Sequence, residues 1–276
     1  MAGKTTSNRS NNSDRTPSRL LRGIGAHATI TEDGFSPGAW VLSIGGAEQS
    51  HVNLAHPEEI FYEYLRRIGN VLDLAAPAGQ PLRALHLGAG ALTLTRYLQA
   101  TRPGSEQHAV ELERELLDFV LAHLPLPEGT VLETVIGDAR EALSRYEPGS
   151  FDAIVLDVFA GADAPDHLTT PEFYAEAAAL LSPAGVLLVN VGDDPGLAFC
   201  RRQVRVVREG LAGIPGAGFA ALGPKSMFTG RYPGNIVLAA TAFPWPEEWT
   251  AQLLAAGPHP ADVLTGERLD VFASGR

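Results

Sequence analysis

Three acidic side chains and a glycine loop occupy positions where short apolar runs of the sequence end. Glu111, Asp138 and Asp157 each close such a run, and the Gly88–Gly90 loop closes the run before them. If the runs are parallel strands, their carboxyl ends meet at one edge of a sheet. Glycines there let backbone N–H groups approach a ligand, and a following helix presents its positive end. The pattern predicts one cleft that combines a glycine loop with three carboxylates.

The spacing of these residues favours a nucleoside ligand. Glu111 lies 23 residues beyond Gly88, where an acidic side chain can accept hydrogen bonds from both hydroxyls of a ribose. Taken singly, Glu111 could be a solvated acid at a helix start, and Asp157 could be a loop acid or a helix cap. Taken together, the carboxylates and the glycine loop indicate a nucleoside site.

Motifs that are present or missing narrow the kind of nucleoside. The dinucleotide fingerprint requires a third glycine where this chain has Thr93, and the phosphate-binding pattern G-x-x-x-x-G-K-[ST] does not occur. Gly137-Asp138-Ala139 follows the third run, an arrangement used to hold the adenine amino group of S-adenosylmethionine-type ligands. These ligands carry no phosphate, so a net-negative cleft suits them better than NAD or ATP.

The elements that position these residues follow from hydrophobic periodicity. Apolar runs alternate with helical patterns, which predicts a parallel sheet with helices on both faces. We expect an α/β fold with a doubly wound, Rossmann-like sheet. The predicted strands are 82–87, 107–112, 130–138, 151–159 and 185–192, with 218–223 and 234–241 completing the sheet edge, and the predicted helices are 91–100, 113–124, 138–146, 171–181 and 198–211.

The N-terminal part of the chain divides into two segments. Residues 1–20 are polar, basic and almost free of apolar side chains, so we expect a disordered tail. Residues 21–56 contain short β-like runs separated by Gly and Pro, which predicts a small β-hairpin region. Pro57 followed by two glutamates predicts the start of a helix, and residues 57–276 are expected to form the Rossmann-like domain.

Composition limits the classes of partner. The chain has 276 residues and a net charge of −11, which disfavours nucleic acid and membrane surfaces and slightly favours cationic ligands. Its single cysteine, Cys200, excludes an intramolecular disulfide and suits a reducing cytoplasm. The sequence has no apolar run long enough for a membrane helix, and its histidine spacing favours no metal site.

Seven segments in the same order resemble the polyamine aminopropyltransferases, the spermidine and spermine synthases. IGGAEQS is similar to LDGxxQS, with Gln49 at its glutamine, and FDAIVLD is similar to YDVIIxD, with Asp157 at its aspartate. RYPGNIVL resembles TYPSGxIGF, with Tyr232 at its tyrosine. The remaining pairs are EEIFYEYL with DEFxYHEML, LRALHLGAGA with KKVLIIGGGDG, AVELE with VVELD, and VIGDA with the GDA motif.

The chain departs from this family mainly on the acceptor side. Ala160 replaces the second aspartate of D-S-x-D-P, which leaves Asp163 and Asp166 as nearby candidates. Phe61 falls at the active-site tyrosine of xYHE, and Tyr62 occupies the next position. The acid of the family's glycine loop is also missing, at Ala91.

The resemblance implies an α/β fold with a Rossmann-like sheet of the class I S-adenosylmethionine methyltransferase type. It also implies a cytoplasmic, homodimeric enzyme that transfers an aminopropyl group from decarboxylated S-adenosylmethionine to a small cationic amine. Asp157 is expected to be the base, supported by Tyr232 and Tyr62. The nucleoside is expected to be held by Gln49, Gly88, Gly90, Glu111, Asp138 and Ala139. Two alternatives stay open, a methyltransferase that uses S-adenosylmethionine and a non-catalytic protein that keeps the nucleoside pocket. The acceptor amine is not determined by the sequence.

Overall fold

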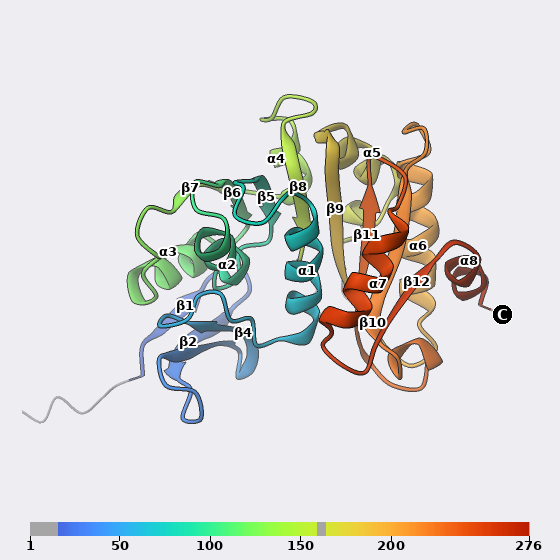
Figure 1. Ribbon diagram of the computed structural model, residues 1–276. Helices are drawn as coiled ribbons and strands as arrows, with labels where there is room; N and C mark the ends of the chain where they lie inside the picture. The colour runs from blue at the N-terminus through green and yellow to red at the C-terminus, as the bar shows by residue number, and fades with distance from the viewer. Residues whose placement is uncertain (1–15, 159–163, 276) are drawn as a thin grey trace, which may run out of the picture.

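The computed structural model describes residues 16–158 and 164–275. Its first element is a small antiparallel sheet of four strands in sequence order, coloured blue in Figure 1. Side chains on one face of this sheet, such as Leu21, Ile30 and Leu42, are buried against the rest of the chain. The strands are β1 (Ser18–Leu21), β2 (Ala26–Glu32), β3 (Ala39–Ile44) and β4 (Ala47–Asn53).

A second sheet of eight strands forms the centre of the molecule. Its order is β12-β10-β11-β9-β8-β5-β6-β7, in which β9-β8-β5-β6-β7 run parallel and the remaining three strands are antiparallel to their neighbours. The strands are β5 (Arg83–Leu87), β6 (Glu106–Glu111), β7 (Val131–Ile136), β8 (Phe151–Leu156), β9 (Leu181–Asp193), β10 (Gly218–Pro224), β11 (Gly234–Thr241) and β12 (Ala261–Thr265).

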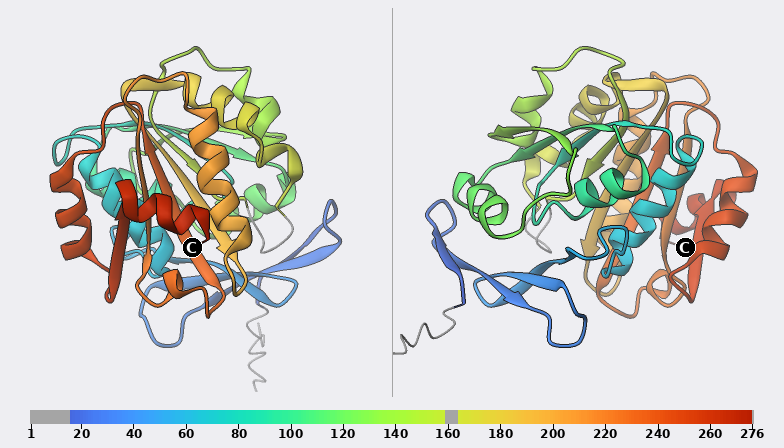
Figure 2. Two further views of the ribbon diagram at one scale, coloured as in Figure 1. Left: turned by 90° about the vertical axis from the view of Figure 1, so that its right-hand side faces the viewer. Right: turned by 60° about the vertical axis from the view of Figure 1, so that its left-hand side comes forward.

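Helices cover both faces of the large sheet (Figure 2). One face packs against α1, α2 and α7, and the other packs against α4, α5, α6 and α8. Helix α3 packs between the large sheet and β1 of the small one. The helices are α1 (Glu63–Leu74), α2 (Thr93–Thr101), α3 (Arg114–His123), α4 (Ala139–Leu143), α5 (Pro171–Ala179), α6 (Ala198–Gly210), α7 (Glu247–Ala256) and α8 (Gly266–Ser274), with 3₁₀ turns η1 (Asp166–Leu168) and η2 (Met227–Thr229).

The order of the parallel strands creates a topological switch point. From β5 the chain moves outward to β6 and β7, and then returns to β8 and β9 on the other side of β5. The loops that follow β5 and β8 therefore diverge, and ligands bind in the crevice between such loops. The predicted α/β fold with a Rossmann-like sheet is confirmed.

Three predictions about the elements need correction. Helix α1 begins at Glu63 and not at Pro57, because Asn53 ties the intervening segment in a different conformation: its carboxamide accepts from the backbone N–H groups of residues 55 and 56 and donates to Glu59. Ser18 to Leu20 of the predicted tail pair with β2, so a tail can extend at most to residue 17, and residues 1–15 lie outside the described part. The C-terminal elements α7, β12 and α8 were not predicted. The division into domains stays a prediction.

Within residues 16–158 and 164–275, none of the helices has the length and apolar character needed to cross a membrane.

Candidate active site

One large cleft, of about 800 Å³, lies at the carboxyl ends of β5, β6, β7 and β8, in the size range of small-molecule sites. The structure brings most of the predicted site residues together here. The lining includes Gln49, Tyr62, Gly88, Gly90, Glu111, Asp138, Ala139 and Asp157. Tyr232 is not among the lining residues, and its side chain is 58% exposed.

The glycine loop follows β5 and is held from the N-terminal sheet. Gly88 and Gly90 have φ angles of +98° and +49°, which non-glycine residues rarely adopt. The backbone N–H of Ala91 donates to the Ser50 hydroxyl at 3.2 Å, and a β-carbon on Gly90 would lie 2.9 Å from the same oxygen. Strand β4 therefore fixes the position of the loop, and helix α2 begins directly behind it at Thr93.

Glu111 ends β6 and lies between the glycine loop and helix α3. One carboxylate oxygen accepts the N–H of Ala89 at 3.2 Å, and the other accepts the N–H of Glu113 at 3.0 Å. Burial raises the pKa of Glu111, and these backbone donors offset only part of the increase. The N–H groups of Gly90 and Leu112 contribute to the same offset. The carboxylate is thus held rigidly by backbone donors, and a ribose diol would share its oxygens with them.

Asp138 follows β7 and caps helix α4. Its Oδ1 accepts the N–H groups of Arg140 and Glu141, at 2.9 and 3.1 Å. Its Oδ2 lies 2.7 Å from His167 Nε2, an interaction that the sequence analysis missed. Burial alone would raise the pKa of Asp138, but the His167 contact and the two backbone donors bring it below its usual value. The amino group of an adenine ring bound at Asp138 would therefore have to share with His167 a carboxylate that already accepts hydrogen bonds.

Asp157 follows β8 at the floor of the cleft. Asn190 Nδ2 on β9 donates to Oδ1 at 2.8 Å, and the Tyr64 hydroxyl on α1 lies 3.3 Å from Oδ2. Burial raises the pKa of Asp157, and the two donors partly offset that effect. Burial and the Asp157 charge also raise the pKa of the Tyr64 phenol, so it stays a proton donor. The group is a desolvated carboxylate, oriented by two side chains.

Sequence reasoning missed Tyr64 and Asn190. Asn190 carries a signal in retrospect, because it is the one polar residue inside the apolar run Val186–Val191. Tyr64 carries none, since it falls in an amphipathic helix where an aromatic residue has many uses.

Gln49 reaches the cleft through a β-bulge. Leu42 on β3 pairs with Ser50, and the next residue, Ser43, pairs with Glu48, so Gln49 is the extra residue of β4. A bulge re-aims the side chain that it inserts. Gln49 lines the cleft as a result.

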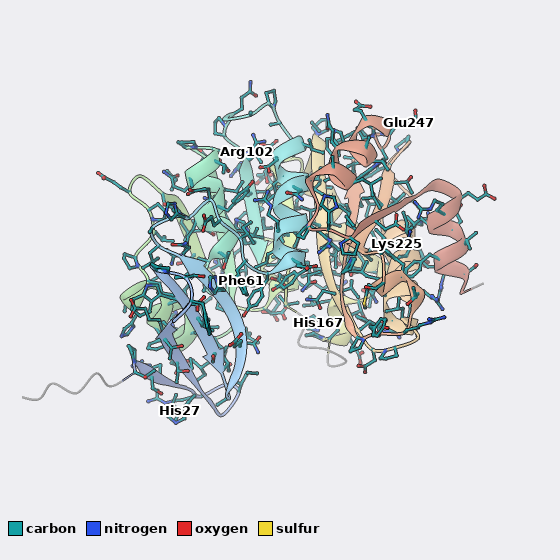
Figure 3. All side chains as sticks on the ribbon, turned by 60° about the horizontal axis from the view of Figure 1, so that its bottom comes forward. His27, Phe61, Arg102, His167, Lys225 and Glu247 are labelled. Carbon is teal, nitrogen blue, oxygen red and sulfur yellow. The ribbon has the colours of Figure 1, made fainter. Side chains whose placement is uncertain are left out.

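The residues at which the chain departs from the family on the acceptor side do not all lie in the cleft. Phe61 is 60% exposed, stacks on His51 with ring centroids 4.3 Å apart, and does not line the cleft. Tyr62 does line it and stacks at 6.3 Å on Tyr64. Asp166 is exposed on η1 and is not a lining residue, while Ala160 and Asp163 lie outside the described residues. Figure 3 shows Phe61 and His167 near the middle of the molecule.

The cleft is strongly acidic. Arg67 is the one Lys or Arg in the described lining, and it pairs with Glu63 at 3.1 Å. Such a cleft attracts cations and repels phosphates. The acidic lining residues are Glu48, Glu63, Glu111, Glu113, Asp138, Asp157 and Asp193. Across the described ranges, no group of three His, Cys, Asp or Glu side chains could hold a metal ion.

Comparison with known proteins shows which proteins this chain resembles. Residues 111–189 match the model of an S-adenosyl-L-methionine-dependent methyltransferase family. A polyamine aminopropyltransferase from Chromobacterium violaceum is 28% identical over 172 residues, which are 61% of this chain and 64% of that protein. The alignment thus spans just under two thirds of that relative.

Two solved structures extend the similarity to the fold. The crystal structure of a probable spermidine synthase from Corynebacterium glutamicum is 28% identical, with a TM-score of 0.82 over 95% of this chain and 94% of that one. A spermidine synthase in complex with the transition-state analogue AdoDATO has a TM-score of 0.58 at 17% identity, covering 84% of this chain and 74% of that one. The second likeness concerns the fold alone.

Proposed function

We propose that this chain, a divergent member of the polyamine aminopropyltransferase family, transfers an aminopropyl group from decarboxylated S-adenosylmethionine to an amine. The observation that carries the proposal is Asp157, a half-buried carboxylate oriented by Asn190 and Tyr64 at the floor of an acidic cleft. The glycine loop, Glu111 and Asp138 lie at the neighbouring strand ends, where a nucleoside would extend away from it.

The chemistry requires a proton acceptor next to the attacking amine. An alkylammonium has a pKa near 10, so the amine must lose a proton before it can attack. Asp157 accepts that proton, and burial raises its pKa, which brings the two groups closer in basicity. The amine lone pair then forms a C–N bond to the carbon next to the sulfonium. The C–S bond breaks with its electron pair moving to sulfur, and methylthioadenosine leaves as a neutral molecule.

Other side chains of the cleft hold the two reactants in line. Glu111 accepts the ribose hydroxyls, Asp138 and Ala139 contact the base, and Gln49 and the Gly88–Gly90 loop enclose the sugar. The acidic lining raises the local concentration of a small cationic amine. Tyr62 and Tyr64 border the space beside Asp157. Positioning of this kind can supply most of the acceleration.

A methyltransferase is the second candidate, because the matched family model over residues 111–189 describes that activity. It would use S-adenosylmethionine, which carries a carboxylate that the decarboxylated form lacks. The acidic lining opposes that extra negative charge, which favours the decarboxylated ligand.

The test measures binding first and turnover second. Calorimetry compares methylthioadenosine, decarboxylated S-adenosylmethionine and S-adenosylmethionine, and mass spectrometry then detects products with a panel of diamines and polyamines. We expect preference for the decarboxylated ligand and a mass gain of one aminopropyl group. In Asp157→Asn, turnover should fall by about 10²–10⁴-fold while methylthioadenosine binding changes much less.

Other outcomes separate the alternatives. Methyl transfer with S-adenosylmethionine would establish the second candidate. Tight methylthioadenosine binding with no product from any amine would favour the non-catalytic alternative. We further propose that the protein is a cytoplasmic homodimer, which light scattering coupled to size exclusion and cell fractionation would test.

A further inference from the structure

A histidine in the floor of the cleft has no role in the mechanism above. His86 lies on β5, two residues before Gly88, inside the apolar run Leu85–Leu87. Its side chain lines the cleft although the residue is only 4% exposed. Burying an imidazole in an apolar strand is costly unless its nitrogens find partners.

A relay of hydrogen bonds fixes the tautomer of His86. Gln107 Nε2 donates to the carbonyl of Thr95 at 3.1 Å, so Gln107 Oε1 is the atom that faces His86 Nε2 at 3.0 Å. An amide oxygen is only an acceptor, so His86 Nε2 carries the proton. Burial lowers the pKa of His86 to about 4, and the ring is neutral near pH 7. Nδ1 is therefore an unprotonated acceptor, and it has no hydrogen-bond partner among the described residues.

The register of the sheet places His86 diagonally across from Asp157, on the same face. His86 pairs with Val155 on β8, and Asp157 follows two residues later and so projects on the same face. Asn190 extends that face on β9, as its hydrogen bond to Asp157 shows. His86, Asp157 and Asn190 therefore share one side of the sheet, and all three line the cleft.

A second acceptor at the same place also lacks a partner. Asn190 is 4% exposed, and its Nδ2 is used by Asp157. Its Oδ1 is buried and makes no hydrogen bond within the described part of the chain. A buried acceptor without a partner costs about 1–3 kcal/mol, so Asn190 Oδ1 points to a missing donor. His86 lines the same cleft, where its Nδ1 can accept from a bound ligand.

We propose that His86 Nδ1 accepts a hydrogen bond from the nitrogen of a primary alkylamine bound beside Asp157, with Asn190 Oδ1 as a second acceptor. An amine nitrogen carries several N–H donors. The oxygen of an ether or ester and the sulfur of a thioether carry no hydrogen and cannot donate. Two neutral acceptors next to one carboxylate recognise such a group without adding further negative charge. His86 is thus a specificity-determining residue, and this inference rests on the proposed function.

Two sources could supply the amine: the aminopropyl arm of the donor or the acceptor polyamine. Methylthioadenosine lacks the arm, so it serves as the probe without an amine. The experiment titrates methylthioadenosine and decarboxylated S-adenosylmethionine into each variant, and then titrates a diamine into the methylthioadenosine complex. All three arms measure binding, so they report on His86 even if the protein proves to have no turnover.

The variants separate the two nitrogens of the ring. In His86→Gln the longer amide reaches the Nε2 position and keeps the bond to Gln107, but the Nδ1 acceptor is lost. In His86→Asn the amide oxygen can occupy the Nδ1 position, and the relay is lost. His108→Gln is the matched control, because His108 is also a buried histidine on the neighbouring strand β6 and does not line the cleft.

We expect His86→Gln to bind methylthioadenosine as the wild type does and to lose about tenfold in affinity for one amine-bearing ligand. Loss for decarboxylated S-adenosylmethionine assigns the contact to the donor arm, and loss for the diamine assigns it to the acceptor. His86→Asn should recover part of the loss, and His108→Gln should match the wild type. Amine affinities within twofold of wild type in His86→Gln, or equal losses for methylthioadenosine, would overturn the proposal. Melting temperatures establish that each variant is folded.

Discussion

The backbone carbonyl of Asp157 occupies the space in which a β-carbon of residue 88 would lie. A β-carbon on Gly88 would approach that oxygen to 2.3 Å, well inside the distance that real β-carbons show. The two residues directly follow the adjacent parallel strands β5 and β8, at the switch point of the sheet. Gly88 is thus required by the close approach of the two loops as well as by its φ of +98°.

Gly88→Ala should therefore damage both stability and ligand binding. The positive φ costs about 1–3 kcal/mol for a side-chain-bearing residue, and the contact with a backbone atom adds to it. Gly79→Ala is the matched control, because Gly79 has a φ of +75° and no atom within 4 Å of the added carbon. Chemical denaturation should show a clearly larger loss for Gly88→Ala. Equal losses would mean that the contact relaxes at little cost.

Glu111→Gln should weaken binding of methylthioadenosine by about 1.5–3 kcal/mol, the range for a hydrogen bond to a charged group. The amide also places an NH₂ group against the N–H of Ala89 or Glu113, so a smaller loss of stability should accompany it. The control is Glu115→Gln on α3, which also removes one negative charge but changes a residue outside the cleft lining. This variant should bind methylthioadenosine as the wild type does. Unchanged calorimetric affinity in a folded Glu111→Gln would refute the ribose assignment.

Tyr64→Phe should lower turnover by about ten- to a hundredfold, because the hydroxyl that orients Asp157 is lost. Tyr232→Phe tests the tyrosine assigned from the sequence. Since Tyr232 is exposed and outside the described cleft lining, we expect its effect to stay within about twofold. Initial rates with saturating donor measure both variants, and the opposite ranking would restore Tyr232 to the catalytic site.

The pH dependence of stability should report on the burial of Asp157. Because burial raises its pKa in the folded state, the folded protein binds the proton more tightly than the unfolded chain does. Stability is then lost as the pH rises from the unfolded pKa through the folded one. Asp157→Asn has no such loss, so its melting temperature should exceed that of wild type at neutral pH, and the gap should close in acid. A difference in melting temperature between Asp157→Asn and wild type that does not vary with pH would contradict this account. The control is Asp118→Asn, which changes an exposed aspartate on α3.

Two truncations should differ in stability. Removing residues 2–15 leaves every described strand in place, and the polar composition of this segment gives it little to bury, so the melting temperature and ligand affinity should not change. Removing residues 2–20 takes away most of β1, which pairs with β2 and packs near α3, and should lower the melting temperature. Thermal unfolding of both proteins decides the matter, and a loss of stability in the shorter truncation would show that residues 2–15 make stabilising contacts.

Local patterns were sufficient to predict much of the fold. The alternation of apolar strands and amphipathic helices between residues 82 and 241 is confirmed, with boundaries that differ by a few residues. The prediction succeeded because parallel strands buried on both faces read as short apolar runs. The last elements were missed because α7 has almost no one-sided apolar stripe and β12 is only five residues long.

Some residues of the site could be placed from the sequence, and others could not. Glu111, Asp138, Asp157 and the glycine loop could be placed in one cleft from the sequence, because each directly follows a strand and parallel strands end at a common edge. Gln49 was assigned by resemblance, and the bulge that brings it to the cleft depends on how β3 and β4 pair. The roles of Gln49 and of the other lining residues stay predictions.

Only the tertiary structure determined the partners of the carboxylates. Tyr64 and Asn190 lie 93 and 33 residues from Asp157, and His167 lies 29 residues from Asp138. Such contacts depend on where α1 packs on the sheet and on which strand neighbours β8. A sequence records the period of each element but not the distance between side chains on different elements. The chemical groups of this site were therefore determined by the sequence, and their hydrogen bonding, protonation and accessibility by the packing.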